Sequence, residues 1–538
     1  MTGDAHSKLA GFAVTGVFLA AGLMMVFHPT ILSGFRQVQT DPGDTRFNNY
    51  LLEHSWKYIS SGGRKVDLWS PAIAYPTPNA LAFSDLMISF GPPYWLFRAF
   101  GAGPTTSFQL WMIVMAMTNF GCMWLFLRRA LGRSMLAASA GASLFAFAAS
   151  RTSQLGHQQL IPQFFLVGIL WALWSVFSAE RLNQSSAPSL FAAALLGVAQ
   201  LYGAFYIWYF TAIVVVLAVV VGLTRRTERP LILPQIRHDR AAILASLTVA
   251  GLLAAPALFH YLAAAGAVGV RGTTTAEPML PRLQSYFLVS PWSWFYGWMS
   301  ELELYKLPYQ REHAIGLGLV TTAVTVYALA SNRRQPIVRV LLVVALILFV
   351  FLTWFPGRLR LWRAVYYLVP GASSIRAVAR IGLLLLFPVA VSVAWWVDRW
   401  RGRWQRCFAI ALALICLLEQ GVTTPSFDGR VAAERVHRLA GEIDPTAHAF
   451  LYLTDDDKPD FVHHIDAMWM QLETGVPTLN LYSGNYPPEW PFREVRVRNR
   501  KERGRLKQAL RSWVQENNLD HTQIQVVGLS GGLDATSQ

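Results

Sequence analysis

Arginines gather in one segment that contains no acidic residue. Residues 358–380 include Arg358, Arg360, Arg363, Arg376 and Arg380, and neither Asp nor Glu occurs among them. Arg376 and Arg380 are four residues apart at the start of an apolar stretch, so a helix would place both on one face. A helix start already carries partial positive charge, so two guanidinium groups there favour a bound anion. We therefore predict a phosphate site, with lipid headgroups or acids from another loop as the alternative partners.

Two aspartates, Asp41 and Asp44, follow the first long apolar stretch closely. Helical spacing separates Phe47, Leu51, His54 and Tyr58, which predicts an amphipathic helix on the membrane surface. Asp44 is placed to cap this helix, and Asp41, before Pro42, is placed to form a turn. Both carboxylates are thus expected at the level of the membrane surface, just before a helix.

Three more polar residues belong to the same region. Glu53 and His54 fall within the expected surface helix, either as ordinary polar-face residues or as ligands. A second surface helix is predicted over Ser84–Phe97, broken at Gly91-Pro92-Pro93. Asp85 is placed either to cap that helix or to serve as a second carboxylate.

Weaker candidates lie in later segments. Arg151 and His157 belong to a short polar loop, in which the histidine either orients a phosphate or a sugar or is structural. Tyr482 lies in a turn-rich aromatic loop that either covers an active site or packs on the surface. A nearby group of possible metal ligands lacks the spacing typical of a metal site: His463, His464 and Asp466.

The composition shows what kind of protein must position these residues. The 538-residue chain is 54% apolar and only 14% charged, against about 25% charged in soluble proteins. This excludes a soluble globule and a disordered chain. The predicted fold class is an all-α polytopic membrane protein with about eleven transmembrane helices. The predicted spans are 9–27, 106–127, 134–149, 161–178, 188–202, 206–223, 241–263, 314–331, 338–354, 381–397 and 407–422.

Basic clusters predict the orientation of these spans. Arginines concentrate at 128–133, 225–240, 333–339 and 399–406, which eleven spans would place on one side. Because short basic loops stay in the cytoplasm, the N-terminus is predicted to be cytoplasmic. The same distribution accounts for the net charge of +15 without a nucleic-acid partner.

The domain prediction follows from the loop lengths. Residues 1–422 form the membrane domain, with a long first outer loop over 34–105, and 423–538 form an outer tail. In the tail, helical and strand patterns alternate, which predicts a small α/β unit. The expected helices cover Val431–Ile443, His464–Glu473 and Arg500–Asn517, and the expected strands cover Ala447–Leu453 and Ile524–Leu529.

Several short motifs resemble those of the GT-C glycosyltransferases, specifically a largely uncharacterised bacterial branch of that class. The long first outer loop, its early acidic residue and its two surface helices are part of this resemblance. The matching residues are Gly43-Asp44-Thr45-Arg46-Phe47-Asn48-Asn49-Tyr50, Leu52-Glu53-His54, Tyr75-Pro76 with Asn79, Ser84-Asp85, Arg151 with His157, Arg376 with Arg380, and Tyr482-Ser483-Gly484.

The resemblance implies an activity and roles for these residues. A sugar would leave a polyprenyl phosphate or diphosphate carrier, with inversion, for an envelope glycan, lipid or protein acceptor on the periplasmic face of the inner membrane. The role of the base that deprotonates the acceptor would fall on Asp44, with Asp41 as the rival. Arg376 and Arg380 would hold the carrier phosphate. The resemblance leaves open whether a divalent cation, Mg²⁺ or Mn²⁺, takes part.

Two other functions remain as alternatives. A flippase or transporter of lipid-linked sugars would need polar residues through the membrane, and ionisable residues are nearly absent from the middle of the predicted spans. A non-catalytic scaffold of polysaccharide assembly would not depend on the loop carboxylates.

Overall fold

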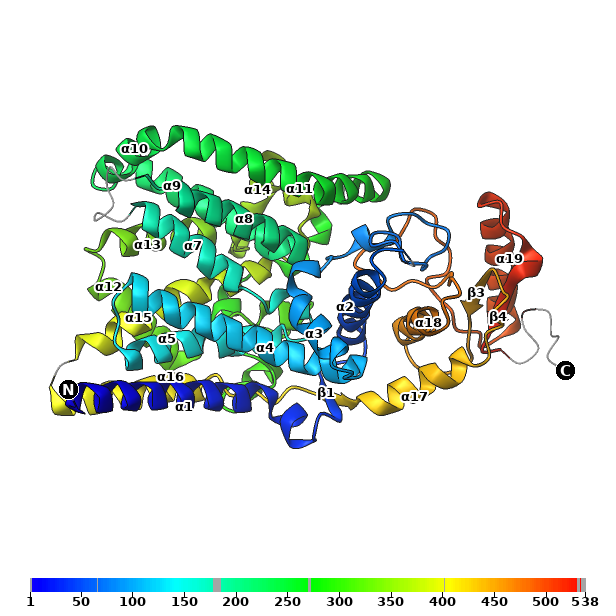
Figure 1. Ribbon diagram of the computed structural model, residues 1–538, viewed down its shortest axis with the longest axis horizontal. Helices are drawn as coiled ribbons and strands as arrows, with labels where there is room; N and C mark the ends of the chain where they lie inside the picture. Colours follow the sequence, from blue (N-terminus) through cyan, green and yellow to red (C-terminus); the bar gives the residue numbers. More distant parts are fainter. Residues whose placement is uncertain are drawn as a thin grey trace. The chain divides into compact units, whose positions relative to one another are not determined.

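A computed structural model describes residues 2–64, 66–177, 185–269, 272–400, 402–529 and 533. The chain folds into two compact units (Figure 1). Unit 1 comprises Met1–Leu32, Trp111–Pro256 and Arg271–Pro425, and unit 2 comprises Ser33–Leu110, Ala257–Val270 and Ser426–Gln538.

Long apolar helices make the chain a polytopic membrane protein, as predicted. Six helical stretches are long and apolar enough to cross a bilayer: Leu9–Leu32, Pro104–Ala130, Gln158–Phe177, Phe205–Thr224, Arg240–Val268 and Val378–Arg399. Three shorter apolar helices cover Ala187–Gly203, Leu319–Ser331 and Val338–Leu352. The two remaining predicted spans coincide with helices α5 (Met135–Phe147) and α16 (Arg403–Leu418). Since the 13 residues of α5 extend only about 20 Å, the number of complete crossings stays a prediction.

The other helices of this part of the chain complete the bundle. They are α1 (Thr2–Leu32), α4 (Pro104–Leu125), α6 (Ala149–Ser153), α7 (Phe164–Phe177), α8 (Ala187–Gly203), α9 (Phe205–Thr224), α10 (Arg229–His238), α11 (Arg240–Val268), α12 (Leu319–Ser331), α13 (Pro336–Leu352), α14 (Trp362–Leu368) and α15 (Leu386–Arg399). In Figure 1, α1 runs beside α5, and α7 runs beside α8.

Small residues allow the central helices of unit 1 to pack closely. Every residue of α5 from Ala137 to Phe147 is buried. A Cβ atom on Gly141 would lie 2.5 Å from the carbonyl oxygen of Ala390 in α15, so only glycine fits at this contact. Such contacts are the usual way in which membrane helices associate without a hydrophobic driving force.

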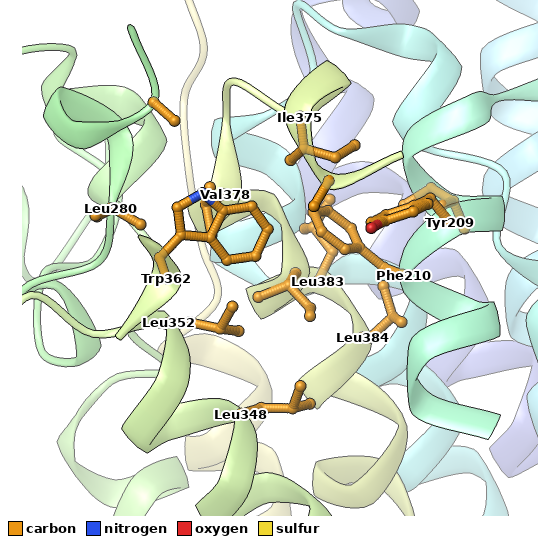
Figure 2. Close-up of a cluster of buried hydrophobic side chains, with 14 of the residues drawn as sticks. Tyr209, Phe210, Leu280, Leu348, Leu352, Trp362, Ile375, Val378, Leu383 and Leu384 are labelled. Carbon is orange, nitrogen blue, oxygen red and sulfur yellow. The ribbon is translucent and has the colours of Figure 1, made fainter. Parts of the chain in front are cut away.

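An apolar cluster in unit 1 anchors the segment that carries the candidate arginines (Figure 2). Tyr209 and Phe210 come from α9, and Leu348 and Leu352 come from α13. They pack with Trp362, Ile375, Val378, Leu383 and Leu384. Helices α9 and α13, which both precede this segment in the chain, therefore hold the backbone around residues 375–385 in place.

Unit 2 contains two small sheets and joins the first loop to the tail. Strand β1 (Gln37–Gln39) pairs antiparallel with β2 (Ser426–Asp428), with Val38 opposite Phe427. Strand β3 (Ala449–Tyr452) pairs parallel with β4 (Ile524–Val527). The helices of this unit include α2 (Asp44–Ser60), α3 (Pro92–Ala99), α17 (Gly429–Ala440), α18 (Asp460–Thr474) and α19 (Arg500–Glu516). The strands and helices that the sequence predicts in the tail are thus present.

Contacts between α2 and α18 connect the loop to the tail. Arg46 Nη1 donates to Asp466 at 2.6 Å, and the Tyr50 hydroxyl donates to Gln471 at 3.2 Å. The loop was predicted as part of the membrane domain, whereas in the structure loop and tail form one compact unit.

The second predicted surface helix is shorter than expected. Residues 84–91 contain only a 3₁₀ turn at Ile88–Phe90, and α3 begins at Pro92. The two prolines stand in the first turn of α3, where a missing N–H costs nothing, so they start the helix rather than break it.

Candidate active site

Asp44 is the first residue of α2, and its side chain contacts the tail. The helix cap is Gly43, and no side-chain hydrogen bond caps this helix. The Tyr482 hydroxyl instead donates a 2.5 Å hydrogen bond to Asp44 Oδ1. Asp44 is therefore not the N-cap residue of this helix, and its half-buried carboxylate accepts a hydrogen bond from the tail.

Asp41 closes the turn that leads into α2. Its Oδ1 accepts a 2.9 Å hydrogen bond from the Gly43 N–H, which confirms the predicted turn. In the same turn Thr40 has φ 75°, a backbone conformation that costs energy for a β-branched residue. The turn thus fixes the direction in which α2 begins, and with it the position of Asp44.

Aromatic rings surround this pair of acids. The ring of Tyr482 lies 5.4 Å from that of Phe47 and 6.0 Å from that of Phe461. A Cβ atom on Gly43 would lie 2.8 Å from Asp41 Oδ1 and 3.0 Å from the Phe461 ring, so a larger residue there would make these side chains shift.

The electrostatics of the site keep Tyr482 as a hydrogen-bond donor. Burial, the neighbouring Asp44 carboxylate and the hydrogen bond to it raise the pKa of the Tyr482 phenol far above its ordinary value, and Asp41 adds to the shift. The phenol therefore stays protonated, and the acids of the first loop and the tyrosine of the tail form one site.

Glu53 and His54 have partners inside unit 2. Glu53 forms a bidentate ion pair with Arg98 at 2.8 and 3.0 Å and accepts from the Tyr94 hydroxyl at 2.7 Å. His54 Nε2 lies 3.1 Å from the Asp67 carbonyl oxygen, and burial lowers the pKa of this imidazole. These contacts hold the first loop together.

Asp85 lies in the irregular segment before α3 and is buried. Around it, the Leu86 N–H donates to the Tyr261 hydroxyl at 3.2 Å, and the Asn79 amide oxygen lies 2.7 Å from His260 Nδ1. The contacts of this segment are thus with the end of α11.

A buried charge cluster behind Asp44 was not expected from the sequence. Asp466 accepts from Arg46 at 2.6 Å and forms an ion pair with Arg435 Nε at 2.7 Å. Arg46 and Asp466 are buried, and burial lowers the pKa of Arg46, opposed by Asp466. Asp466 was named above only as a possible metal ligand, and in the structure its carboxylate pairs with the two arginines. The cluster ties the start of α2 to α17 and α18.

In unit 1, Arg380 pairs with an acid from a distant loop. Its Nη2 and Nε lie 2.7 and 3.0 Å from the two carboxylate oxygens of Glu312, and His157 Nε2 lies 3.2 Å from Oε1. Burial by itself would raise the pKa of Glu312, but Arg380 and the hydrogen bonds from His157 and Arg380 hold it well below its ordinary value. An acid from another loop, the alternative partner in the sequence analysis, thus pairs with Arg380.

Arg376 differs from Arg380, and the prediction that both share a helix face is wrong. The helix begins at Val378 as a 3₁₀ turn, and Ala377 before it has ψ 75°, which is not helical. The N–H groups of Arg376 and Ala377 donate to the Tyr206 hydroxyl at 3.1 and 3.4 Å. The Arg376 side chain is exposed, and none of the described residues pairs with its guanidinium group.

Arg151 is buried, and its donors are used by neighbouring groups. It donates to the carbonyl oxygens of Phe145 at 3.0 Å and Ile161 at 2.8 Å, and to the Gln163 amide oxygen at 3.0 Å. Burial lowers the pKa of this guanidinium group. The structure therefore joins His157 to Arg380, whereas Arg151 binds mainly backbone carbonyl oxygens elsewhere.

Within the described part of the chain, no group of three or more His, Cys, Asp or Glu side chains is arranged to hold a metal ion.

The chain is similar in fold to solved structures of GT-C glycosyltransferases. The archaeal oligosaccharyltransferase AglB from Archaeoglobus fulgidus, in complex with an inhibitory peptide and a dolichol-phosphate, is 11% identical, with a TM-score of 0.53 over 95% of this chain and 69% of that chain. The arabinofuranosyltransferase AftD from Mycobacteria is 16% identical, with a TM-score of 0.47 over 81% of this chain. This chain spans only 30% of the AftD chain. The fold of this chain is thus similar to that of AglB, and the resemblance to the GT-C class is confirmed at the level of the fold.

Comparisons of the sequence itself give no match. No family model matches this chain, and no curated protein matches it.

Proposed function

We propose that the protein is an inverting membrane glycosyltransferase that uses a sugar linked to a polyprenyl phosphate or diphosphate. The acceptor is an envelope glycan, lipid or protein on the periplasmic face of the inner membrane. The observation that supports this most directly is the carboxylate of Asp44, half-buried at the start of α2 and oriented by Tyr482, in a chain with a GT-C fold.

In the proposed reaction Asp44 takes the proton of the acceptor hydroxyl. The acceptor oxygen forms a bond to the anomeric carbon as the bond from that carbon to the carrier phosphate breaks, and the phosphate leaves with the electron pair. Tyr482 keeps the carboxylate in one orientation, and Asp41 fixes the turn before it. No step is assigned to a metal ion, and the effect of a chelator on transfer would test for one.

The carrier phosphate is proposed to bind Arg376. Its exposed guanidinium group has no ion-pair partner among the described residues, so an arriving phosphate displaces no internal acid. Arg380 supports the same segment through Glu312 and does not need to touch the carrier.

The proposed topology has eleven spans, a cytoplasmic N-terminus and a periplasmic tail. The basic clusters support this orientation, and a helix overlaps each of the eleven predicted ranges.

The activity can be tested with purified protein and radiolabelled polyprenyl-phosphate sugars. Extracted envelope glycans, lipids and proteins are offered in turn as acceptors, and labelled product is counted. We expect label to reach one acceptor class with inversion at the anomeric carbon. A protein that moves the labelled lipid across a vesicle bilayer without forming product is a flippase, and one that does neither is a scaffold; both results contradict the proposal.

A further inference from the structure

Three arginines of unit 1 lie in one cluster with a single carboxylate, that of Glu277, which pairs with two of them. Arg363 donates to Glu277 Oε1 at 2.7 and 3.1 Å, and Arg360 forms an ion pair with the other oxygen of Glu277. The third arginine, Arg282, has no ion-pair partner among the residues that the structure describes. The cluster therefore has three positive charges and one negative charge.

Two isolated β-bridges to Trp354 bring Arg282 and Arg360 close together. Backbone bridges place Trp354 beside Arg282 on one side and beside Arg360 on the other, and the Trp354 N–H donates to the Pro281 carbonyl oxygen at 2.8 Å. Laterally paired residues of extended segments point to the same face. The guanidinium carbons of Arg282 and Arg360 accordingly lie 4.3 and 3.8 Å from the indole centroid.

The Trp354 indole alone does not compensate the positive charges of Arg282 and Arg360. A cation over an indole is stabilised by about 0.5–2 kcal/mol, whereas a desolvated guanidinium group needs an anion and hydrogen-bond acceptors. The Nε atoms of both Arg282 and Arg360 are buried without a hydrogen-bond partner in the described part of the chain. Burial and the charge of Arg360 lower the pKa of Arg282.

The position of the cluster indicates which anion would meet it. Trp354 stands two residues beyond the end of the apolar helix α13, which is where a span reaches the headgroup layer. Exposed apolar side chains flank the arginines: Leu283 is 41% exposed, Phe287 53% and Leu359 52%. A ligand here would have a phosphate for the arginines and a hydrocarbon part for these side chains.

We propose that Arg282, Arg360 and Arg363 bind the phosphate group of a membrane lipid. The oxygens of one phosphate can accept hydrogen bonds from several guanidinium groups. The Glu277 carboxylate, in contrast, pairs with only two of the three arginines. Neither the proposed transferase activity nor Arg376 is needed for this site, so the proposal can hold where the enzyme proposal fails. The lipid is a phospholipid or a polyprenyl phosphate, which share this chemistry.

The test measures equilibrium binding of four ligands to the full-length protein in neutral detergent. They are dihexanoyl phosphatidic acid, farnesyl phosphate, inorganic phosphate and uncharged dihexanoylglycerol. We expect the two lipid phosphates to bind and Arg282→Gln to weaken both at least about ten-fold, the scale for one charge-assisted contact. Tighter binding of farnesyl phosphate would indicate the carrier lipid, and equal binding would indicate any lipid phosphate; either result supports the site.

Two further variants separate binding from folding. Arg311→Gln is the matched control, since Arg311 also lies over an indole of the same loop, 4.7 Å from the Trp292 centroid. It should leave the affinities unchanged. Glu277→Gln removes the competing carboxylate and should tighten phosphate binding, which a folding defect cannot imitate. Unchanged affinity in Arg282→Gln, equal losses in Arg282→Gln and Arg311→Gln, weaker binding in Glu277→Gln, or inorganic phosphate binding as tightly as the lipids would overturn the proposal.

Discussion

The hydroxyl of Tyr482 donates a 2.5 Å hydrogen bond to the carboxylate of Asp44, although 438 positions separate the two residues in the sequence. The first loop and the tail therefore contribute one acid and one phenol to the same site. This relationship gives the tail a defined part in the proposed chemistry, namely to orient the base.

The first prediction concerns that hydrogen bond. Tyr482→Phe keeps the ring contacts with Phe47 and Phe461 but removes the donor. A hydrogen bond to a charged group contributes about 1.5–3 kcal/mol, so transfer should fall at least about ten-fold. Tyr75→Phe is the control, because it removes a 2.9 Å hydrogen bond to His448 elsewhere in unit 2. A rate equal to that of the wild type in Tyr482→Phe would show that the phenol does not position the base.

The second prediction separates the two arginines of the carrier segment. Arg376→Ala should weaken binding of a polyprenyl phosphate roughly ten- to a hundred-fold, leave a neutral polyprenol unaffected and keep the melting temperature. Arg376→Lys should cost less, because lysine keeps the charge but not the planar fork.

Arg380→Ala, in contrast, should destabilise the protein by about 3–5 kcal/mol, because it leaves Glu312 buried without its guanidinium partner. Thermal unfolding of both variants, followed beside lipid binding, checks the difference. If Arg376→Ala weakens the neutral and charged lipids equally, the residue has no specific phosphate contact.

The third prediction follows from the low pKa of Glu312. A carboxyl group whose pKa is lower in the folded state stabilises that state above its unfolded pKa, whose ordinary value is 4.5. This stabilisation is lost progressively as the pH falls below that value. The melting temperature of the wild type should therefore drop between neutral and acidic pH more steeply than that of Glu312→Gln. Parallel pH curves would show that the ion pair with Arg380 does not contribute.

A fourth prediction concerns topology. Eleven spans with a cytoplasmic N-terminus put Val422 outside and Arg229 inside. Alkaline phosphatase fused after Val422 should be active in cells, and the same enzyme fused after Arg229 should be inactive. Reversed activities would place the proposed base on the wrong side of the membrane.

Helix positions could be predicted because they are set by local apolar runs. Each predicted span coincides with a helix, and α2 begins where the segment after Asp41 predicted a helix. The 3₁₀ turn at Val378 was not predictable in this way, because the non-helical ψ of Ala377 has no sequence signature. The same limit explains the wrong prediction that Arg376 and Arg380 share a face.

Contacts between residues that are far apart in the chain could not be predicted from the single sequence. The partners of Arg380, Arg46 and Tyr482 come from segments far away in the chain. Glu312 in particular looks like an ordinary loop acid until the fold brings Arg380 beside it. The packing of the first loop with the tail was missed for the same reason, since it depends on contacts between α2 and α18.

The central claim is that Asp44 is the base of a glycosyl transfer, and the most direct test is the transfer rate of Asp44→Asn with a radiolabelled polyprenyl-phosphate sugar. Asn keeps the shape and can still accept the hydrogen bond of Tyr482, but it cannot take a proton. We expect the rate to fall at least about 100-fold with unchanged thermal stability. Asp41→Asn should stay active, because its amide oxygen can still accept from the Gly43 N–H. Asp428→Asn, at the start of α17, is a matched control. Full activity of Asp44→Asn together with an inactive Asp41→Asn would move the role to Asp41, and full activity of both would contradict the account.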